Sequence, residues 1–199
     1  TTEIYTLSLH DALPISDAKK GVIRDNTEAM KAYMPYNKTI KAGENTVFVN
    51  DFAHLDDVEA SIIAAEKIAK ALETDVYVRP HIENSGFFHV KNPEIGIGKP
   101  NNFADLKTFD NKKSTSTRKF VKNGIKSAGK QQCNSVILDF TNDSESDFLS
   151  QAADKLHGEL AGKHKPTIKK VILIKGDQVL QVSRQDINRK NYIDFFKMD

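Results

Sequence analysis

Hydrophobic residues recur at helical spacing in three stretches of the chain. In residues 53–73, 116–131 and 144–160 the apolar side chains fall three or four positions apart, so they share one face of a helix. Ser144 with an acid three positions later is typical of a helix start, and Gly162 is typical of a helix end. We predict three amphipathic helices with these apolar faces: Leu55, Val58, Ile62, Ala65, Ala69 and Leu72; Val121, Ile125 and Ala128; and Phe148, Leu149, Ala152, Leu156 and Leu160.

The segments between these helices are typical of strands, because they alternate in hydrophobicity or are rich in β-branched residues. Residues 135–140, SVILDF, form an almost continuous apolar run, which indicates a central strand covered on both faces. Lys175, Gly176 and Asp177 separate two apolar runs and predict a hairpin. Strands are predicted at residues 46–50, 75–82, 87–90, 102–109, 135–140, 168–174 and 179–182.

The order of these elements predicts the fold class. A helix, three strands, a helix and a strand are followed by a further helix and a hairpin. A helix that leads into a buried strand is typical of a crossover between parallel strands, whereas a hairpin pairs antiparallel strands. We therefore predict an α/β fold with a mixed central sheet.

Composition restricts the class of protein further. The 199 residues suit one domain, and 39% hydrophobic with 28% charged residues is typical of a soluble globular chain. The formal net charge is only +2, so affinity for nucleic acid would have to come from a local patch. Cys133 is the single cysteine, which excludes an internal disulfide. No apolar run approaches the ~20 residues that span a bilayer, and no Cys/His cluster has zinc-ligand spacing.

The first part of the chain is set apart by its sequence. The chain begins with Thr1 rather than Met, and we expect it to be a fragment of a longer protein. Residues 5–16, YTLSLHDALPIS, resemble the translation of a sequencing-library adapter, so we expect segment 1–16 to be an artefact or a tail outside the core. A genuine short strand or helix is the alternative. Residues 17–45 are assigned to an N-terminal extension, and residues 46–199 to the domain itself.

The stretch 92–109, NPEIGIGKPNNFADLKTF, carries the strongest candidate chemistry. Asp105 and Lys107 are two residues apart on a predicted strand, so their side chains share one face of the sheet. Glycine, proline and asparagine residues after Glu94 predict a turn that brings Glu94 across from this pair. Two close carboxylates suit Mg²⁺ or Mn²⁺, and a neighbouring lysine can orient water or neutralise charge on a phosphate. A polar strand facing solvent is the alternative interpretation.

Basic residues follow one side of the predicted helix at 116–131. Between residues 111 and 131 the chain carries seven basic residues and no acid. A solvated helix face usually mixes charges of both signs, so an unpaired basic stripe predicts contact with a phosphate backbone. The predicted contact residues are Lys119, Lys122, Lys126 and Lys130.

Two acids, Glu59 and Glu66, lie at the edge of the apolar stripe of the helix at 53–73. From that position a carboxylate can reach over the rim of the core into a neighbouring site. The alternative is that it extends into water, as long polar side chains at such an edge usually do.

Together these residues resemble the core of the PD-(D/E)xK nuclease superfamily. The Pro93-Glu94 pair, the Asp105-x-Lys107 triplet and the lysine-rich helix ending KSAGKQQCNSVILDF resemble, more narrowly, the C-terminal nuclease domains of CdiA-type contact-dependent inhibition toxins. Related domains end some phage head-morphogenesis proteins. The resemblance covers about residues 46–183. It implies a restriction-endonuclease-like αβββαβ core, with a C-terminal helix and β-hairpin added.

The resemblance also implies catalytic roles. Glu94 matches the acid after the motif's proline, and Asp105 and Lys107 match the acid-x-lysine motif. Glu94 and Asp105 would therefore hold the metal. Glu59 or Glu66 would match the acid on the first helix, and Glu59 is preferred. In this chain Glu and Asp exchange the positions at which they are commoner in the superfamily, which changes the reach of each carboxylate by one methylene.

The implied function is metal-dependent hydrolysis of phosphodiester bonds, with tRNA as the expected substrate. Mg²⁺ or Mn²⁺ is the expected cofactor and Zn²⁺ the alternative, while Lys130 and Gln131 would contact the phosphate. An immunity protein would be a partner, and the domain would act in the bacterial cytoplasm, delivered by a secreted toxin or carried by a phage protein. A DNA endonuclease and a non-catalytic nucleic-acid-binding or head-assembly module are the alternatives. The sequence shows no aromatic platform of the kind that binds single-stranded RNA.

Overall fold

The computed structural model describes residues 35–53, 58–81, 92–111, 116–144, 148–161 and 167–189. Within these residues eight strands form one sheet, and four helices accompany it. In chain order the elements are β1 (Lys38–Ala42), β2 (Asn45–Val49), α3 (Val58–Ala71), β3 (Val76–Val78), β4 (Ile95–Ile97), β5 (Phe103–Thr108), α4 (Thr117–Lys130), β6 (Ser135–Asp139), α5 (Phe148–Leu160), β7 (Lys170–Lys175), β8 (Gln178–Ser183) and α6 (Arg184–Arg189).

The strands lie in the sheet in the same order as in the chain, from β1 to β8. Three neighbouring pairs are parallel and are joined through helices: β2 and β3 through α3, β5 and β6 through α4, and β6 and β7 through α5. The other neighbouring pairs are antiparallel. Gly43 (φ 66°) and Gly176 (φ 56°) occupy the left-handed region in the turns of the two outermost hairpins, which favours glycine there. The predicted α/β class with a mixed sheet is confirmed.

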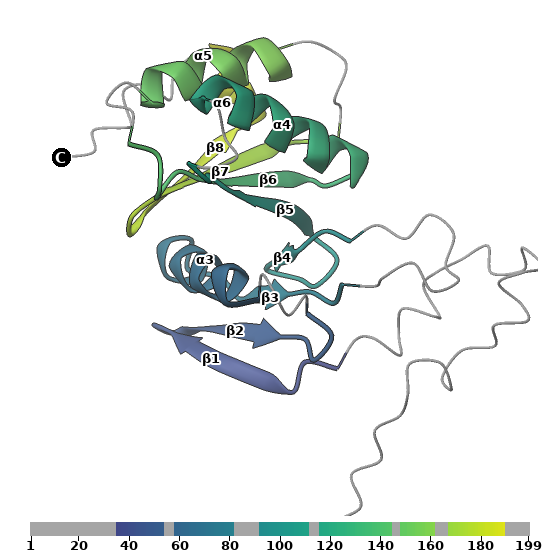
Figure 1. Ribbon diagram of the computed structural model, residues 1–199. Helices are drawn as coiled ribbons and strands as arrows, with labels where there is room; N and C mark the ends of the chain where they lie inside the picture. Colours follow the sequence, from purple (N-terminus) through teal and green to yellow (C-terminus); the bar gives the residue numbers. More distant parts are fainter. Residues whose placement is uncertain are drawn as a thin grey trace, which may run out of the picture.

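The sheet is curled, and different helices cover its two faces (Figure 1). We call the face against α3 the inner face and the opposite face the outer face. On the inner face α3 buries side chains from both ends of the sheet, among them Val47, Val76, Ile137, Ile172 and Ile174. On the outer face α4 and α5 cover β5 to β7 and bury Val136, Leu138, Val171 and Leu173. β6 is buried at every position, as predicted for a strand covered on both faces.

The predicted helices and the last hairpin are confirmed with small shifts in their ends. α3 falls within predicted residues 53–73, α4 within 116–131 and α5 within 144–160. Ser116 caps α4, because its side chain accepts a hydrogen bond from the backbone N–H of Lys119 at 3.3 Å. β7 and β8 pair about the predicted turn.

Three elements lie where the sequence predicted none. β1 belongs to segment 17–45 but pairs with β2 along its whole length, so the sheet begins before residue 46. β4 occupies part of the predicted turn after Glu94, since Ile95 pairs with both Val78 of β3 and Ala104 of β5. α6 is a third addition, after β8.

Some predictions fall outside the described residues: the character of segment 1–16, most of the extension at 17–45, Leu55 and the strand at 87–90. In the ranges that the structure describes, no helix is both long and apolar enough to cross a membrane.

Candidate active site

Glu94 lies immediately before β4, where it is held by both neighbouring strands. Its backbone carbonyl accepts a hydrogen bond from the N–H of Arg79 at 2.9 Å, next to β3. Its carboxylate Oε2 accepts a hydrogen bond from the N–H of Leu106 at 2.9 Å, on β5. Because Ile95 pairs with Ala104, the antiparallel register places Glu94 beside Asp105. The backbone and the side chain of Glu94 are therefore both fixed by the sheet.

Lys107 joins the two carboxylates. Its Nζ lies 3.2 Å from Glu94 Oε1 and 3.2 Å from Asp105 Oδ1. It also donates to the carbonyl of Leu106 at 2.7 Å. The three side chains therefore converge, as the sequence predicted. They do so on the outer face of the sheet, because Ala104 and Leu106, which alternate with Asp105 and Lys107 along β5, point into the inner core.

The three groups differ in their access to solvent. The side chains of Glu94 and Lys107 are each 33% exposed, whereas that of Asp105 is only 1% exposed. Asp105 Oδ2 is buried without a hydrogen-bond partner. A buried carboxylate oxygen without a partner is costly, so a hydrogen-bond donor or a cation at this atom would stabilise the site.

Burial and charge act in opposite directions on the ionisation of the cluster. Burial raises the pKa of Glu94, the ammonium of Lys107 opposes this rise, and the nearby Asp105 adds to it. Burial alone would lower the pKa of Lys107, but Glu94 and Asp105 together raise it above its usual value. Lys107 is therefore held in its charged form at neutral pH. With all three groups ionised, the cluster carries one net negative charge and attracts a cation.

The donor set fits a hard divalent cation. Mg²⁺ is commonly held by one or two carboxylates together with water and substrate phosphates, so Glu94 and Asp105 are sufficient protein ligands. The unpartnered Oδ2 of Asp105 offers one such oxygen. In the described part of the chain, no group of three or more His, Cys, Asp or Glu residues is arranged to hold a metal, so the site depends on these two carboxylates.

Among the described residues, neither helix acid contacts Glu94, Asp105 or Lys107. Glu59 is exposed in the first turn of α3, and Glu66 is partly exposed in the same helix. α3 packs against the inner face of the sheet, whereas Glu94, Asp105 and Lys107 meet on the outer face. The buried side of α3 consists of Ser61, Ala64, Ala65, Ile68 and Ala69, so Glu59 lies away from the core, whereas the half-buried Glu66 lies at its rim.

The basic helix lies close to the cluster. Gly124 of α4 faces β5 and β6, and a Cβ built there would lie 3.8 Å from Lys107 Cγ and 2.5 Å from Leu138 Cδ2. Glycine at this position therefore allows α4 to approach the strand that carries the site. The predicted contact residues all lie on the exposed side of the helix: Lys119, Lys122, Lys126 and Lys130.

Gln131, at the end of α4, makes a contact that the sequence did not predict. Its Oε1 accepts a hydrogen bond from the backbone N–H of Asn92 at 3.0 Å. Gln131 thus connects the end of α4 to the segment that leads into Pro93 and Glu94. This hydrogen bond positions the segment that carries Glu94, and it leaves the side-chain Nε2 of the partly exposed Gln131 able to donate to a phosphate.

Arg79 and Cys133 belong to the same region, and sequence reasoning did not select either as a site residue. Arg79 is 4% exposed, its Nη1 donates to the carbonyl of Pro93 at 2.8 Å, and its guanidinium carbon lies 4.3 Å from the centre of the Phe103 ring. Cys133 is fully buried, and burial, followed by the charge of Asp105, raises its pKa to about 12. The available signal was an arginine at an alternating position of the strand segment DVYVRPHI, just before a proline.

A cavity of about 100 Å³ opens beside Glu94. Its walls include Val58 and Ser61 of α3, Arg79 and His81 after β3, and Asn92. No family model, curated protein or solved structure matches the chain. Its function is therefore inferred from this site and from the motifs that it contains.

Proposed function

We propose that this chain is a metal-dependent nuclease domain whose active site is Glu94, Asp105 and Lys107. The observation that carries the proposal is the contact of one ammonium with two carboxylates at 3.2 Å each, beside a helix whose exposed side is basic. A site that cuts phosphodiesters needs ligands for a cation and positive charge for the phosphate backbone, and both occur here.

The order of elements supports a restriction-endonuclease-like core. α3, β3, β4, β5, α4 and β6 follow one another in the αβββαβ order that the motifs imply. The Pro-acid motif enters the second strand of this series, and the acid-x-lysine motif lies on the third. The remaining α5 and the β7–β8 hairpin correspond to the additions expected after the core.

Each residue has a distinct part in the proposed reaction. Glu94 and Asp105 would hold Mg²⁺ or Mn²⁺, with Zn²⁺ as an alternative. When bound, the cation supplies charge neutralisation on the phosphate and a lowered pKa for a coordinated water. Lys107 remains protonated, because its pKa is raised, so it stabilises charge on the phosphate and does not remove a proton from water.

The exposed lysines of α4 would hold the phosphate backbone next to this site. The family resemblance favours tRNA as substrate, an immunity protein as partner, and action in the bacterial cytoplasm as part of a larger toxin or phage protein. A non-catalytic module that binds nucleic acid or takes part in head assembly is the second candidate. It is favoured by the presence of only two carboxylates in the described part of the site.

One experiment tests the proposal. The full chain is incubated with total tRNA and with plasmid DNA, in Mg²⁺, Mn²⁺ or Zn²⁺ and in EDTA. We expect cleavage of tRNA that needs a divalent cation and is lost in Asp105→Asn, which keeps the size of the side chain and removes its charge. Asp177→Asn, an exposed change in the β7–β8 turn, is the matched control and should cut normally.

Cleavage of plasmid alone would identify a DNA endonuclease. Binding of tRNA without cleavage in any metal would favour the non-catalytic module. Cleavage by Asp105→Asn at the unaltered rate would place the active site elsewhere.

A further inference from the structure

Aromatic rings cover the outer face of the sheet on β2 and β3. The rings of Phe48 and Tyr77 are stacked, with centres 4.8 Å apart and planes 9° apart. The ring of Tyr36 meets that of Tyr77 edge-on, with centres 5.4 Å apart. All three side chains are partly exposed. Phe48 and Tyr77 alternate with valines that are buried against α3, so their rings face away from that helix, and Tyr36 packs on the same side through Tyr77.

This aromatic face is continuous with the candidate active site. Tyr77 precedes Arg79 by two residues. The backbone N–H of Arg79 donates a hydrogen bond to the backbone carbonyl of Glu94. Strand geometry places the backbone of Tyr77 about 8 Å from that of Glu94, from two residues of rise and one strand spacing. Arg79 extends the same surface to β5, because its guanidinium lies over the ring of Phe103.

The face also carries unpaired positive charge. Arg79 is 4% exposed, and no carboxylate in the described residues forms an ion pair with it. In those residues, the buried side-chain polar atoms without a hydrogen-bond partner are Tyr36 Oη, Arg79 Nε and Asp105 Oδ2. A buried cation without a counter-charge is costly, and an anion bound on this face would offset that cost. Lys41 of β1 adds a further exposed positive charge on the same face, where it donates to Thr46 Oγ1 at 3.3 Å.

We propose that Phe48, Tyr77 and Arg79 form a subsite that binds one unpaired nucleotide of the substrate, next to the bond that is cut. The base stacks on the aromatic rings, and the negative charge of the backbone lies near Arg79. This inference rests on the proposed nuclease function and narrows its substrate class to single-stranded segments. Stacking on aromatic side chains accepts any base, whereas the bases of a duplex are already stacked and paired.

The absence of tryptophan from the chain makes this subsite directly observable. In an Asp105→Asn background, which prevents cutting, Tyr77→Trp introduces a single indole at the proposed stacking position. A single-stranded RNA of about 12 nucleotides should quench its fluorescence, and the same RNA annealed to its complement should not. Ile63→Trp, at a 48% exposed position of α3, is the matched control and should show no quenching.

Affinity gives a second readout. Tyr77→Leu should weaken binding of the single-stranded RNA roughly 5- to 100-fold, whereas Tyr77→Phe keeps the ring and should bind normally. Quenching by single strands alone, together with this pattern, supports the subsite whether or not the unaltered chain cuts. If the indole fluorescence does not change while the unaltered chain cuts tRNA, the subsite is overturned and the nuclease proposal stands. A chain that neither cuts nor binds any nucleic acid would overturn both, and the aromatic face would then serve contact with protein.

Discussion

At the scale of single residues, Gly124 decides how closely the basic helix approaches the candidate active site. A side chain added there would meet Leu138 Cδ2 at 2.5 Å, and Leu138 is fully buried. Overpacking by Gly124→Ala should cost about 1–3 kcal/mol, whereas the higher helix propensity of alanine should contribute only ~1 kcal/mol. We therefore expect a net decrease in the free energy of unfolding. Urea unfolding measures the difference.

Gly158 of α5 provides the matched control, because nothing lies within 4 Å of a Cβ built at that position. Gly158→Ala should therefore raise the free energy of unfolding by roughly 0.5–1 kcal/mol, through helix propensity alone. Equal stabilisation by both changes would show that α4 does not pack on Leu138 as described.

Glu94 makes stability depend on pH. Burial raises its pKa in the folded state above that of an unfolded glutamate. Such a group contributes stability that is fully present below its unfolded pKa, about 4.3, and is lost as the pH rises through the folded pKa. We therefore expect the difference in free energy of unfolding between the unaltered chain and Glu94→Gln to decrease as the pH rises from about 4.3 through the folded-state pKa of Glu94. Urea titrations of both proteins at a series of pH values measure it.

Glu59→Gln controls for the loss of one negative charge, because Glu59 is exposed and lies on the other side of the sheet. If the advantage of the unaltered chain over Glu94→Gln grew with pH instead, the attraction of Lys107 would outweigh burial. The pKa of Glu94 would then be lowered rather than raised.

At the scale of elements, sequence periodicity predicted what depends on local pattern. The three long helices, the buried β6 and the shared face of Asp105 and Lys107 all follow from the spacing of side chains along one element. β4 has only three residues with a central glycine, so it shows no alternation to detect. Gly96 is needed there because a Cβ would lie 2.7 Å from the carbonyl oxygen of Lys99, in the turn that folds back over the strand.

Features that depend on which strands are neighbours were not predictable in this way. Phe48 and Tyr77 lie side by side only because α3 returns the chain to pair β3 with β2. The aromatic face was therefore missed, and so was Arg79, whose partners come from Pro93 and Phe103. Glu59, which was predicted at the edge of the apolar stripe, is exposed, because the stripe that α3 buries is rotated away from it.

The lysines of α4 carry a prediction about salt dependence. Lys126 is exposed on the side of the helix that is turned away from the core. If it contacts a phosphate, Lys126→Glu should weaken tRNA binding and reduce the slope of log affinity against log salt by about one unit. Titration of the Asp105→Asn background with tRNA at several salt concentrations gives this slope.

Lys70→Glu is the control for that measurement. Lys70 is exposed in the last turn of α3, on the other side of the sheet, so the same reversal of charge should leave the slope unchanged. Equal reductions for both changes would mean that tRNA responds to total charge, and that α4 is no specific contact surface.

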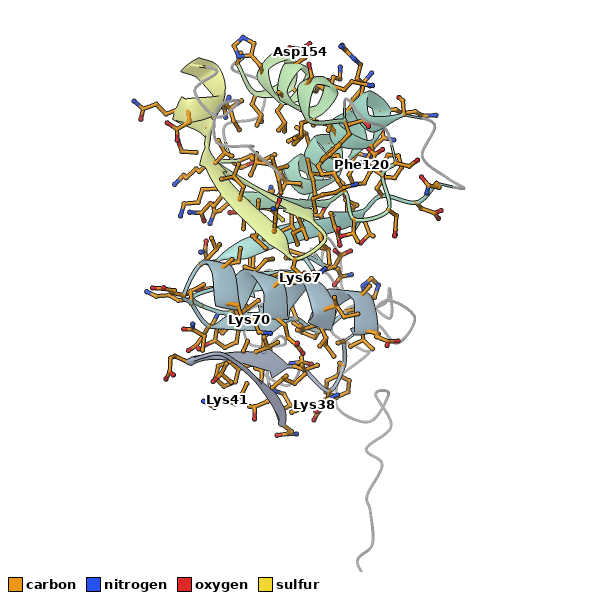
Figure 2. The ribbon with its side chains drawn as sticks, turned by 90° about the vertical axis from the view of Figure 1, so that its left-hand side faces the viewer. Lys38, Lys41, Lys67, Lys70, Phe120 and Asp154 are labelled. Atoms are coloured by element: carbon orange, nitrogen blue, oxygen red, sulfur yellow. The ribbon has the colours of Figure 1, made fainter. Side chains whose placement is uncertain are left out.

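At the scale of the whole molecule, the curl of the sheet brings its last strands back to the first helix. α3 packs with β1, β2 and β3, and its core also includes Ile172 and Ile174 of β7. Figure 2 shows Lys67 on α3 beside the end of the β7–β8 hairpin. Lys67 Nζ donates to the carbonyl of Gly176 in that turn at 2.6 Å. α3 therefore connects the two ends of the sheet, and the candidate active site lies on the strands between them.

This connection predicts a specific loss of stability when the lysine head group is removed. Lys67→Met keeps most of the apolar stem but removes the charged donor to Gly176, and we expect the free energy of unfolding to fall by roughly 1–3 kcal/mol. The ion pair with Asp177 adds little, because its 4.0 Å separation lies at a fully exposed carboxylate. Lys70→Met, one turn later at an exposed position, should change stability by less than about 0.5 kcal/mol. Thermal and urea unfolding of both variants compare the two positions. Equal small effects would mean that apolar packing of β7 on α3 holds the curled sheet without help from the turn.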